Sequence, residues 1–408
     1  MTTTTHPAAD ISPGTTRLLA VAAGLIVASL YYAQTLVGPI SRATGLSLDA
    51  AGLIVTLTQV GYALGLLFIV PLGDLLENRK LVFVLLLATS AMLALAAFSS
   101  SAALFLATSL GIGLGSVAAQ VLVPFAAHLS REETRGQTVG KVVSGLLVGI
   151  MLARPLASLV ADHFSWHAVY GAAALAVVLL AFVLRARLPQ RVPQGGLPYG
   201  RLIGSMWQLL RTTPLLRRRA VYHAAMFASF SLFWTVTPLV LAGSSFHLSQ
   251  TGIAIFALVG VAGAVASPVA GRLADRGHTV YATAAALLLG VAGFVLPLAA
   301  PDSRELALAL LVLASIVLDM GVAANLVLSQ RALFALGAEV RSRLNGIFFA
   351  LFFAGGALGS ALGAWVYARH GWDAALLTGM AFPAAALAWW IAEWAGRGIT
   401  RSAQVPLQ

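Results

Sequence analysis

The sequence predicts an all-α membrane protein with twelve transmembrane helices in two pseudo-symmetric six-helix bundles. Two observations carry this prediction, the composition and an internal repeat. Of the 408 residues, 59% are hydrophobic and 10% are charged, whereas a soluble globular protein carries about 25% charged residues. The repeat relates residues 135–166 to residues 341–372, which show the same pattern at an offset of 206. Paired repeats with a binding site between them are typical of secondary transporters.

Twelve apolar stretches are long enough to cross a bilayer, which requires about 20 mostly apolar residues. Six precede the longest polar stretch of the chain and six follow it. In chain order they are 18–40, 50–72, 80–99, 102–128, 138–161, 166–186, 220–243, 250–271, 279–300, 305–333, 345–368 and 372–395. Their scattered glycines and prolines are usual for helices packed in lipid.

An even number of spans places both chain ends on one side of the membrane. If that side is the cytoplasm, 21 of the 25 Lys and Arg lie inside, three lie outside and Arg154 lies within a span. This asymmetry satisfies the positive-inside rule. The predicted order is a disordered cytoplasmic tail, an N-terminal bundle, a cytoplasmic basic linker, a C-terminal bundle and a second cytoplasmic tail. Their bounds are 1–17, 18–186, 187–219, 220–395 and 396–408.

The formal charge of +11 follows from this topology, and the basic linker is expected to meet anionic lipid headgroups. Basic and aromatic residues are not interleaved as in single-strand binding sites, which argues against nucleic acid as a partner. The chain has no cysteine, which excludes disulfides and thiolate metal sites. It has no P-loop, metal-ligand spacing or Ser-His-acid set, so we expect neither an enzyme nor ATP-driven transport.

Related loop motifs follow spans two and eight. The second copy contains Gly271, Leu273, Ala274, Asp275 and Arg276. The first copy keeps Asp74 and Arg79 but has Leu75 and Glu77 at two other motif positions. With the two six-span halves and the central basic loop, these motifs resemble the major facilitator superfamily, whose loop signature is G-x-L-A-D-R-x-G-R-K. The resemblance covers essentially the whole chain and implies the fold of that superfamily.

Span five is similar to the antiporter signature G-x-x-x-G-P-x-x-G-G of the same superfamily. The matching residues are Gly149, Ala153, Ala157 and Ser158. Arg154 stands where the signature has its proline, and span four lacks the intramembrane arginine that many drug:proton antiporters carry there. The chain thus resembles bacterial twelve-span efflux members with an incomplete antiport signature.

The loop motifs are expected, by this resemblance, to form a cytoplasmic gate. Asp74 and Asp275 stand where a carboxylate would cap the N-terminus of a neighbouring helix. Arg79 in the first motif, and Arg276 in the second motif with Gly271, are nearby to pair with these carboxylates. The alternative interpretation is ordinary juxtamembrane charge that obeys the positive-inside rule.

Two charges lie near the middle of predicted spans, Arg154 in span five and Asp319 in span ten. A charge at the bilayer centre costs at least about 2.5–3.5 kcal/mol, so such residues usually face protein or a water-filled cavity. At 1.5 Å per residue their depths differ by about 7.5 Å, within the reach of an arginine. We hypothesise an ion pair between the halves that breaks when Asp319 takes up a proton.

The alternatives to this proton-coupling pair are a fixed structural pair and separate partners for the two charges. Neither charge has a counterpart in the other half, because the offset of 206 carries Arg154 to Ser360 and Asp319 back to Gly113. Coupling of transport to protons is therefore expected at these two positions, where the two copies of the repeat differ.

The family resemblance implies that spans one, four, seven and ten line the substrate cavity. The candidates in these spans are Tyr31, Gln34, Gln120, Phe230, Trp234 and Asn325. A buried amide needs hydrogen-bond partners, which favours Gln34 as a solute contact. The alternatives are amides that join helices and an aromatic stripe that packs in the core or against lipid.

Two rows of small residues repeat every four positions, on one face of a helix each. They are Gly149, Ala153 and Ala157 in span five, and Gly355, Gly359 and Gly363 in span eleven. Such rows allow close helix packing in lipid, and a smooth face lets the halves slide as they rock.

The leading hypothesis is a secondary transporter of the bacterial cytoplasmic membrane, functional as a monomer. It would export a small organic solute, a drug or metabolite, in exchange for protons, with the proton gradient as its energy source and no cofactor. One alternative is an importer of a small organic anion, by proton symport or facilitated diffusion, because Arg154 could pair with a carboxylate. Another is a membrane sensor that binds solute without moving it.

Overall fold

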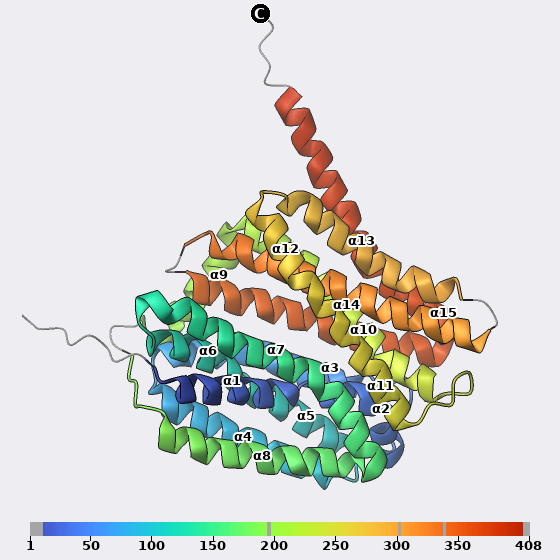
Figure 1. The fold of residues 1–408 in the computed structure, drawn as a ribbon, viewed down its shortest axis with the longest axis horizontal. Coiled ribbons are helices and arrows are strands. Elements are labelled where there is room, and N and C mark those ends of the chain that lie inside the picture. The colour runs from blue at the N-terminus through green and yellow to red at the C-terminus, as the bar shows by residue number, and fades with distance from the viewer. Residues whose placement is uncertain (1–10, 194–196, 301–302, 338–339, 403–408) are drawn as a thin grey trace, which may run out of the picture.

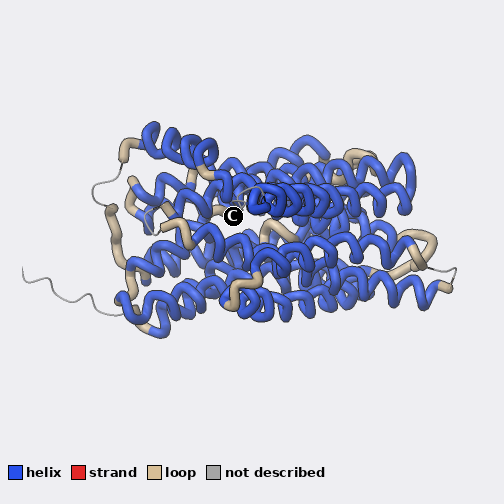
Figure 2. Tube along the Cα trace, turned by 90° about the horizontal axis from the view of Figure 1, so that it is seen from above, coloured by secondary structure: helices blue, strands red, loops and turns tan. Residues whose placement is uncertain are grey.

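A computed structural model describes residues 11–193, 197–300, 303–337 and 340–402 of the chain. The connections between its helices are short and lie mostly at the two ends of a helix bundle (Figure 2). Eleven helical segments of the described chain are long and apolar enough to cross a membrane. The last, α15 (Arg341–Ser402), contains Gly371 with a φ of 81°, a backbone conformation that glycine adopts without strain. Because two spans meet there, the predicted twelve-helix membrane fold is confirmed.

The part of the N-terminal half that the structure describes contains eight α-helices and one 3-10 helix. They are α1 (Pro13–Ala28), α2 (Tyr32–Thr44), α3 (Leu53–Phe68), η1 (Val70–Asp74), α4 (Asn78–Ala97), α5 (Ala102–Ser116), α6 (Ala118–His128), α7 (Glu132–His163) and α8 (Trp166–Arg187). Span one is interrupted between α1 and α2, and span four at Val117. Serine side chains at positions 12, 101 and 165 cap α1, α5 and α8, since each satisfies a free N–H of the first turn.

The C-terminal half follows the same plan with fewer interruptions. Its elements are α10 (Pro214–Ala242), α11 (Gln250–Val259), η2 (Gly260–Val265), α12 (Ala266–Asp275), α13 (Thr279–Leu298), α14 (Arg304–Phe334) and α15. Spans seven and ten are continuous helices here, whereas their counterparts, spans one and four, are broken. Among the described residues of this half, only span eight is interrupted, by the 3-10 turn η2.

Helical structure extends further into the polar segments than hydropathy predicted. Helix α1 begins at Pro13, inside the predicted tail, because Ser12 caps it and proline suits the first turn. Helix α10 begins at Pro214, before residue 220, and α15 continues to Ser402. The remaining parts of the predicted tails, residues 1–10 and 403–408, lie outside the described residues.

The predicted linker contains the helix α9 (Tyr199–Thr212), which hydropathy did not predict. Leu202 and Met206 are buried on one face, and Arg201 and Arg211 are exposed on the other. The Tyr199 hydroxyl donates to the carbonyl of Phe68 over 2.8 Å, which ties α9 to the end of α3. We refer below to the end of the bundle that carries α9 as the linker end (Figure 1).

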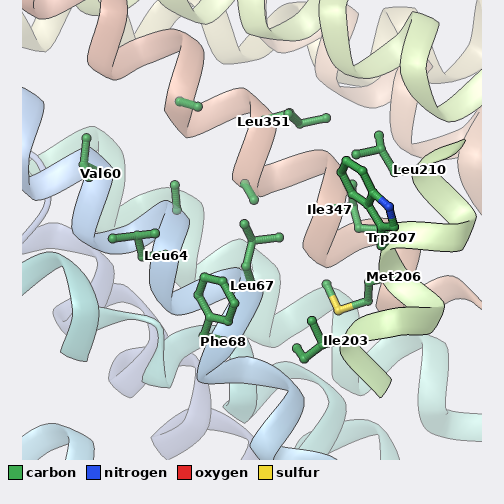
Figure 3. Close-up of a pocket in the computed structure, with 13 residues that line it drawn as sticks. Val60, Leu64, Leu67, Phe68, Ile203, Met206, Trp207, Leu210, Ile347 and Leu351 are labelled. Atoms are coloured by element: carbon green, nitrogen blue, oxygen red, sulfur yellow. The ribbon is translucent and has the colours of Figure 1, made fainter. Parts of the chain in front are cut away.

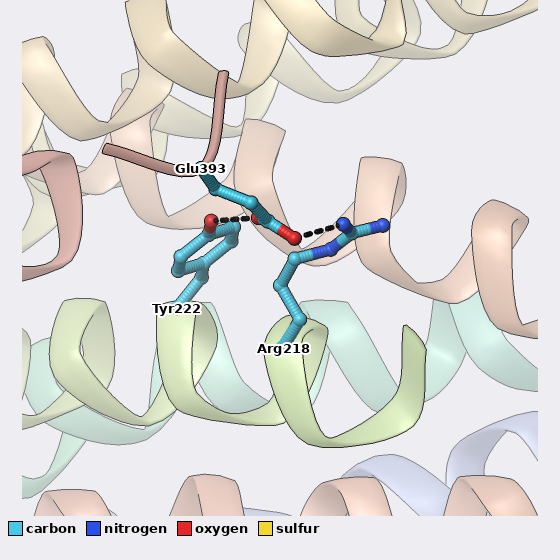
Figure 4. A network of polar contacts seen from close by, with 3 residues as sticks. All are labelled: Arg218, Tyr222 and Glu393. Carbon is cyan, nitrogen blue, oxygen red and sulfur yellow. Dashed lines mark hydrogen bonds and ion pairs between the residues drawn. The ribbon is translucent and has the colours of Figure 1, made fainter. Parts of the chain in front are cut away.

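The first turns of α10 are tied to the second helical part of α15. Arg218 Nη1 donates to Glu393 Oε1 over 2.5 Å, and the Tyr222 hydroxyl donates to Glu393 Oε2 over 3.0 Å (Figure 4). Arg219 is buried and donates to Thr283 over 2.8 Å. These two linker arginines contact protein, and the contact of the basic linker with lipid headgroups stays a prediction.

The two halves pack against each other, and in Figure 1 the C-terminal half is drawn above the N-terminal half. Within each half, a small-residue row lies at a close helix contact. A Cβ on Gly149 would overlap the backbone of Gly24 in α1, and a Cβ on Gly359 would overlap the backbone of Ala228 in α10. Gly355 packs in the same way on Ala224, and Gly363 packs on Leu232. Ala153 and Ala157 are buried.

The halves contact each other strongly at the end opposite the linker end. The Thr56 and Ser360 hydroxyls hydrogen-bond over 2.8 Å between α3 and α15. Thr251 at the start of α11 donates to Asp162 Oδ2 near the end of α7, through its backbone N–H over 3.2 Å and its hydroxyl. Asp49 accepts from Arg369 over 3.5 Å, and hydrogen bonds from Ser47 and Arg369 lower the pKa of the Asp49 carboxyl.

Candidate functional site at the centre of the bundle

Arg154 lies at the centre of the bundle on α7, with its guanidinium against aromatic rings of α10. Its Cζ is 4.0 Å from the ring centroid of Trp234 and 5.1 Å from that of Phe230. The residue is only 4% exposed. Its Nε and Nη1 have no hydrogen-bond partner among the described residues. A desolvated cation–π contact contributes about 2 kcal/mol or more, so the two rings offset part of the cost of at least about 2.5–3.5 kcal/mol for a charge near the bilayer centre.

Asp319 on α14 is also buried and contacts the same indole from its edge. Trp234 Nε1 donates to Asp319 Oδ1 over 3.1 Å. Arg154 and Asp319 attract each other electrostatically, but no direct ion pair joins them among the described residues. In this structure Trp234 lies between the two residues of the predicted pair. Its ring face contacts the guanidinium of Arg154, and its N–H donates to the carboxylate of Asp319. We call Arg154, Trp234 and Asp319 the central triad.

Irregular backbone surrounds the central triad on both sides. The 3-10 turn η2 packs against Asp319, and a Cβ on Gly260 would lie 2.9 Å from Asp319 Oδ2 and 2.8 Å from Trp234 Cζ2. Only glycine allows this approach without displacing the neighbours. On the Arg154 side, the Thr35 hydroxyl at the start of α2 donates to the carbonyl of Arg154 over 3.3 Å. Interrupted helices beside a binding site are typical of secondary transporters.

Span one contributes Tyr31 and Gln34 to this region. Tyr31 is buried within electrostatic range of Arg154, at the break between α1 and α2. Gln34 is fully buried, and neither its Nε2 nor its Oε1 has a hydrogen-bond partner among the described residues. A buried amide without partners is uncommon in proteins, and the role of Gln34 as a solute contact stays a prediction.

The other predicted amides are hydrogen-bonded to protein. Gln120 Nε2 donates to the Tyr62 hydroxyl over 3.1 Å, which joins spans four and two. Asn325 Nδ2 lies 3.0 Å from Nδ1 of His223, whose ring lies 4.8 Å from that of Phe352 and 5.5 Å from that of Phe348. Gln120 and Asn325 thus connect helices, which is the alternative to a solute contact that the sequence left open.

The loop motifs form contacts that differ from those expected. Asp275 pairs with Arg331 of α14, not with Arg276, and Gly271 lies against the same arginine. Arg79 donates to the carbonyl of Leu188 over 3.1 Å. The pairings of Asp74 with Arg79 and of Asp275 with Arg276 were therefore wrong.

Asp74 instead lies near a linker arginine, Arg191. Arg191 Nη1 donates to Asn78 Oδ1 over 2.5 Å, and its carbonyl accepts from the Asn78 N–H over 3.0 Å. Burial lowers the pKa of Arg191, and the Asp74 charge opposes that shift. Asp74 and Arg191 line a small pocket together with Ser342 at the start of α15, so this motif lies where the halves and the linker meet.

Gln59 in span two is a further amide that the sequence offers as a cavity residue or as a contact between helices. Gln59 Nε2 donates to Ser231 over 2.9 Å and so joins α3 to α10 across the halves. Its partner Ser231 was not predicted from the sequence. Within the described residues, no group of three His, Asp or Glu is placed to hold a metal ion.

Comparisons with known proteins agree with this architecture. The sequence profile of the Major Facilitator Superfamily matches residues 19–337. The uncharacterized transporter YgaY of Escherichia coli O157:H7 is 38% identical over 95% of this chain and 97% of its own length. The probable transporter SCO4007 of Streptomyces coelicolor is 30% identical over 94% of this chain and 86% of its own.

Solved structures share the fold at low sequence identity. A bacterial homolog of the human lysosomal transporter Spinster, in an inward-facing and occupied conformation, has a TM-score of 0.73 at 14% identity, with 93% of this chain and 96% of the other covered. The human organic anion transporter MFSD10 has a TM-score of 0.64 at 20% identity, with 93% and 100% covered. The chain is thus a multi-pass transporter of the bacterial inner membrane, not an enzyme, and it belongs to the Major Facilitator Superfamily.

Proposed function

We propose that this transporter carries a small organic anion together with a proton by alternating access, with the linker end in the cytoplasm. The observation that carries the proposal is the state of Arg154. It is a buried cation with two unpartnered nitrogen positions, held on aromatic faces instead of on a carboxylate. An anionic group would hydrogen-bond to the guanidinium, and the rings of Phe230 and Trp234 would contact an apolar body.

The sign of the proton coupling follows from the central triad. Arg154 and Asp319 contact the same indole, and a nearby cation favours the ionised form of a carboxylate. An anion bound to Arg154 would neutralise that cation and add its own repulsion to Asp319, and proton binding at Asp319 would become more favourable. Two ligands that favour each other's binding travel together, which supports symport of the anion and the proton.

Proton uptake on anion binding tests this sign. The purified transporter is placed in weakly buffered detergent solution, and small aromatic carboxylates and sulfonates are added at matched pH with a proton indicator. We expect net proton uptake for a binding anion. Arg154→Gln should abolish binding, and Asp319→Asn should retain binding without proton uptake. Proton release on binding, or uptake that persists in Asp319→Asn, would contradict symport through Asp319.

Efflux in exchange for protons is the second candidate. It is supported by the antiporter-like row in α7, where Gly149 packs on the backbone of α1. In proteoliposomes with an acidic interior, an antiporter would accumulate solute inside, whereas a symporter would drive it out.

A further inference from the structure

An apolar groove opens between the two halves at the linker end, away from the central triad. Its volume is about 480 Å³, and all of its lining residues are apolar side chains of α3, α9 and α15 (Figure 3). Leu64, Phe68 and Trp207 on its rim are 40%, 46% and 57% exposed. The groove therefore faces the surroundings of the bundle, not its interior.

The direction of the groove matches that of a lipid tail. Val60 and Phe68 both line it on α3, and eight residues of helix span about 12 Å. Phe68 is the last residue of α3 at the linker end, so the groove runs from that end into one leaflet. Half of a hydrocarbon core of about 30 Å is about 15 Å, close to the length of the groove.

Positive charge lies at the mouth of the groove. Trp207 lines it from α9, and Arg211 lies with its Cζ 5.0 Å from the Trp207 ring. Arg201 is exposed on the same helix. Residues 185–219 contain eight arginines and no acidic residue. Arginine binds phosphate oxygens with a planar fork of N–H donors, and basic segments beside a cytoplasmic leaflet attract anionic lipids.

We propose that this groove binds an anionic phospholipid of the surrounding leaflet, with an acyl chain between α3, α9 and α15 and its phosphate on Arg211. The bound lipid would contact both halves and the linker helix at once. It would thereby hold α9 against the bundle in the conformation described here. This site is separate from the proposed transport site, so either proposal can fail without the other.

Fluorescence quenching by brominated lipids tests the site. The full chain is reconstituted in phosphatidylcholine vesicles that contain equal mole fractions of either brominated phosphatidylglycerol or brominated phosphatidylcholine. Subtracting the signal of Trp207→Phe isolates the quenching of Trp207. We expect brominated phosphatidylglycerol to be about fivefold more effective, the preference expected of one arginine near an anionic lipid. Arg211→Gln should remove that preference.

Trp365 provides a matched control, because it is 41% exposed and lies 5.4 Å from Arg369 without lining the groove. Its quenching should show a smaller preference for the anionic lipid than that of Trp207. Ala354 is exposed and lines the groove, so Ala354→Phe should fill it and reduce the quenching of Trp207 alone. Equal quenching of Trp207 by both lipids, or no effect of Ala354→Phe, would overturn the proposal. Quenching of Trp207 that falls as the protein-to-lipid ratio rises would instead indicate that a second copy covers the groove.

Discussion

Trp234 contacts two opposite charges with two different parts of one ring. An aromatic ring carries negative potential on its face and positive potential on its edge, so the face suits Arg154 and the N–H suits Asp319. The indole keeps both charges near each other without letting them form a direct ion pair. A direct buried pair would gain strong attraction at short range and would be hard to separate during a transport cycle.

Replacing Trp234 with Phe separates these two roles. The ring face stays, but the N–H donor to Asp319 is lost. A hydrogen bond to a charged group contributes about 1.5–3 kcal/mol, and 1.36 kcal/mol corresponds to about one pH unit. Because the donor stabilises the ionised carboxylate, its loss should move the pH midpoint of transport upward by about one to two units. Measured pH profiles check this, with Trp389→Phe as the control.

An unchanged midpoint in Trp234→Phe would show that the hydrogen bond does not control the protonation that limits transport. A loss of transport at every pH, with normal expression, would show that the indole is needed to bind the solute instead.

The sequence predicts a depth difference between Arg154 and Asp319, but it does not predict that both contact Trp234. Counting residues along two spans gives a depth difference, because a helix rises by a fixed amount per residue. Lateral position depends on how α7, α10 and α14 pack, and periodicity does not contain that information. Trp234 lies between the two charges because of this packing. The same limit explains why Asp275 was assigned to a neighbouring arginine, whereas it pairs with Arg331 of α14.

Two of the interrupted helical elements lie beside the central triad. The break between α1 and α2 lies beside Arg154, and η2 lies beside Asp319. Hydropathy predicted these spans as single stretches, because a break in a membrane helix changes few apolar residues. Hydropathy also did not predict α9, because the polar face of this helix keeps its apolar content below that of a spanning segment. Twelve spans were predictable since lipid permits only helices of a minimum apolar length in such a chain.

Gly260→Ala tests whether η2 positions the central triad. The added methyl group would lie 2.8 Å from Trp234 Cζ2 and 2.9 Å from Asp319 Oδ2, so one of these groups must move. We expect transport to fall several-fold and overpacking to cost about 1–3 kcal/mol of stability. Both are measured on purified protein, by proteoliposome flux and thermal unfolding.

Gly140→Ala in α7 is the matched control, since nothing lies within 4 Å of the methyl group it would add. Alanine is more favourable than glycine in a helix interior by about 0.5–1 kcal/mol, so this variant should transport normally and unfold at a slightly higher temperature. If Gly260→Ala behaved in the same way, η2 would not position Trp234 or Asp319.

At the scale of the whole molecule, the two halves share one packing scheme and differ where charge is placed. Gly149 and Gly355 occupy corresponding close contacts with α1 and α10. The counterpart of Arg154 is Ser360, which bonds to Thr56 across the halves, and the counterpart of Asp319 is Gly113, which packs on the backbone of Tyr62. The symmetric positions therefore hold helices together, whereas the asymmetric positions provide the charges of the central triad.

Alternating access requires the contact between Thr56 and Ser360 to open and close. The chain contains no cysteine, so Thr56→Cys combined with Ser360→Cys would introduce its only two thiols. The native hydroxyl oxygens are 2.8 Å apart, so sulfur atoms at these positions would need to approach by less than about 1 Å to reach the disulfide distance of about 2.05 Å. Oxidation should join the halves at this end and stop transport, and a reducing agent should restore it. Each single variant should transport under both conditions, and full transport by the oxidised double variant, with cross-linking verified by mass spectrometry, would exclude a rocking motion that opens this end.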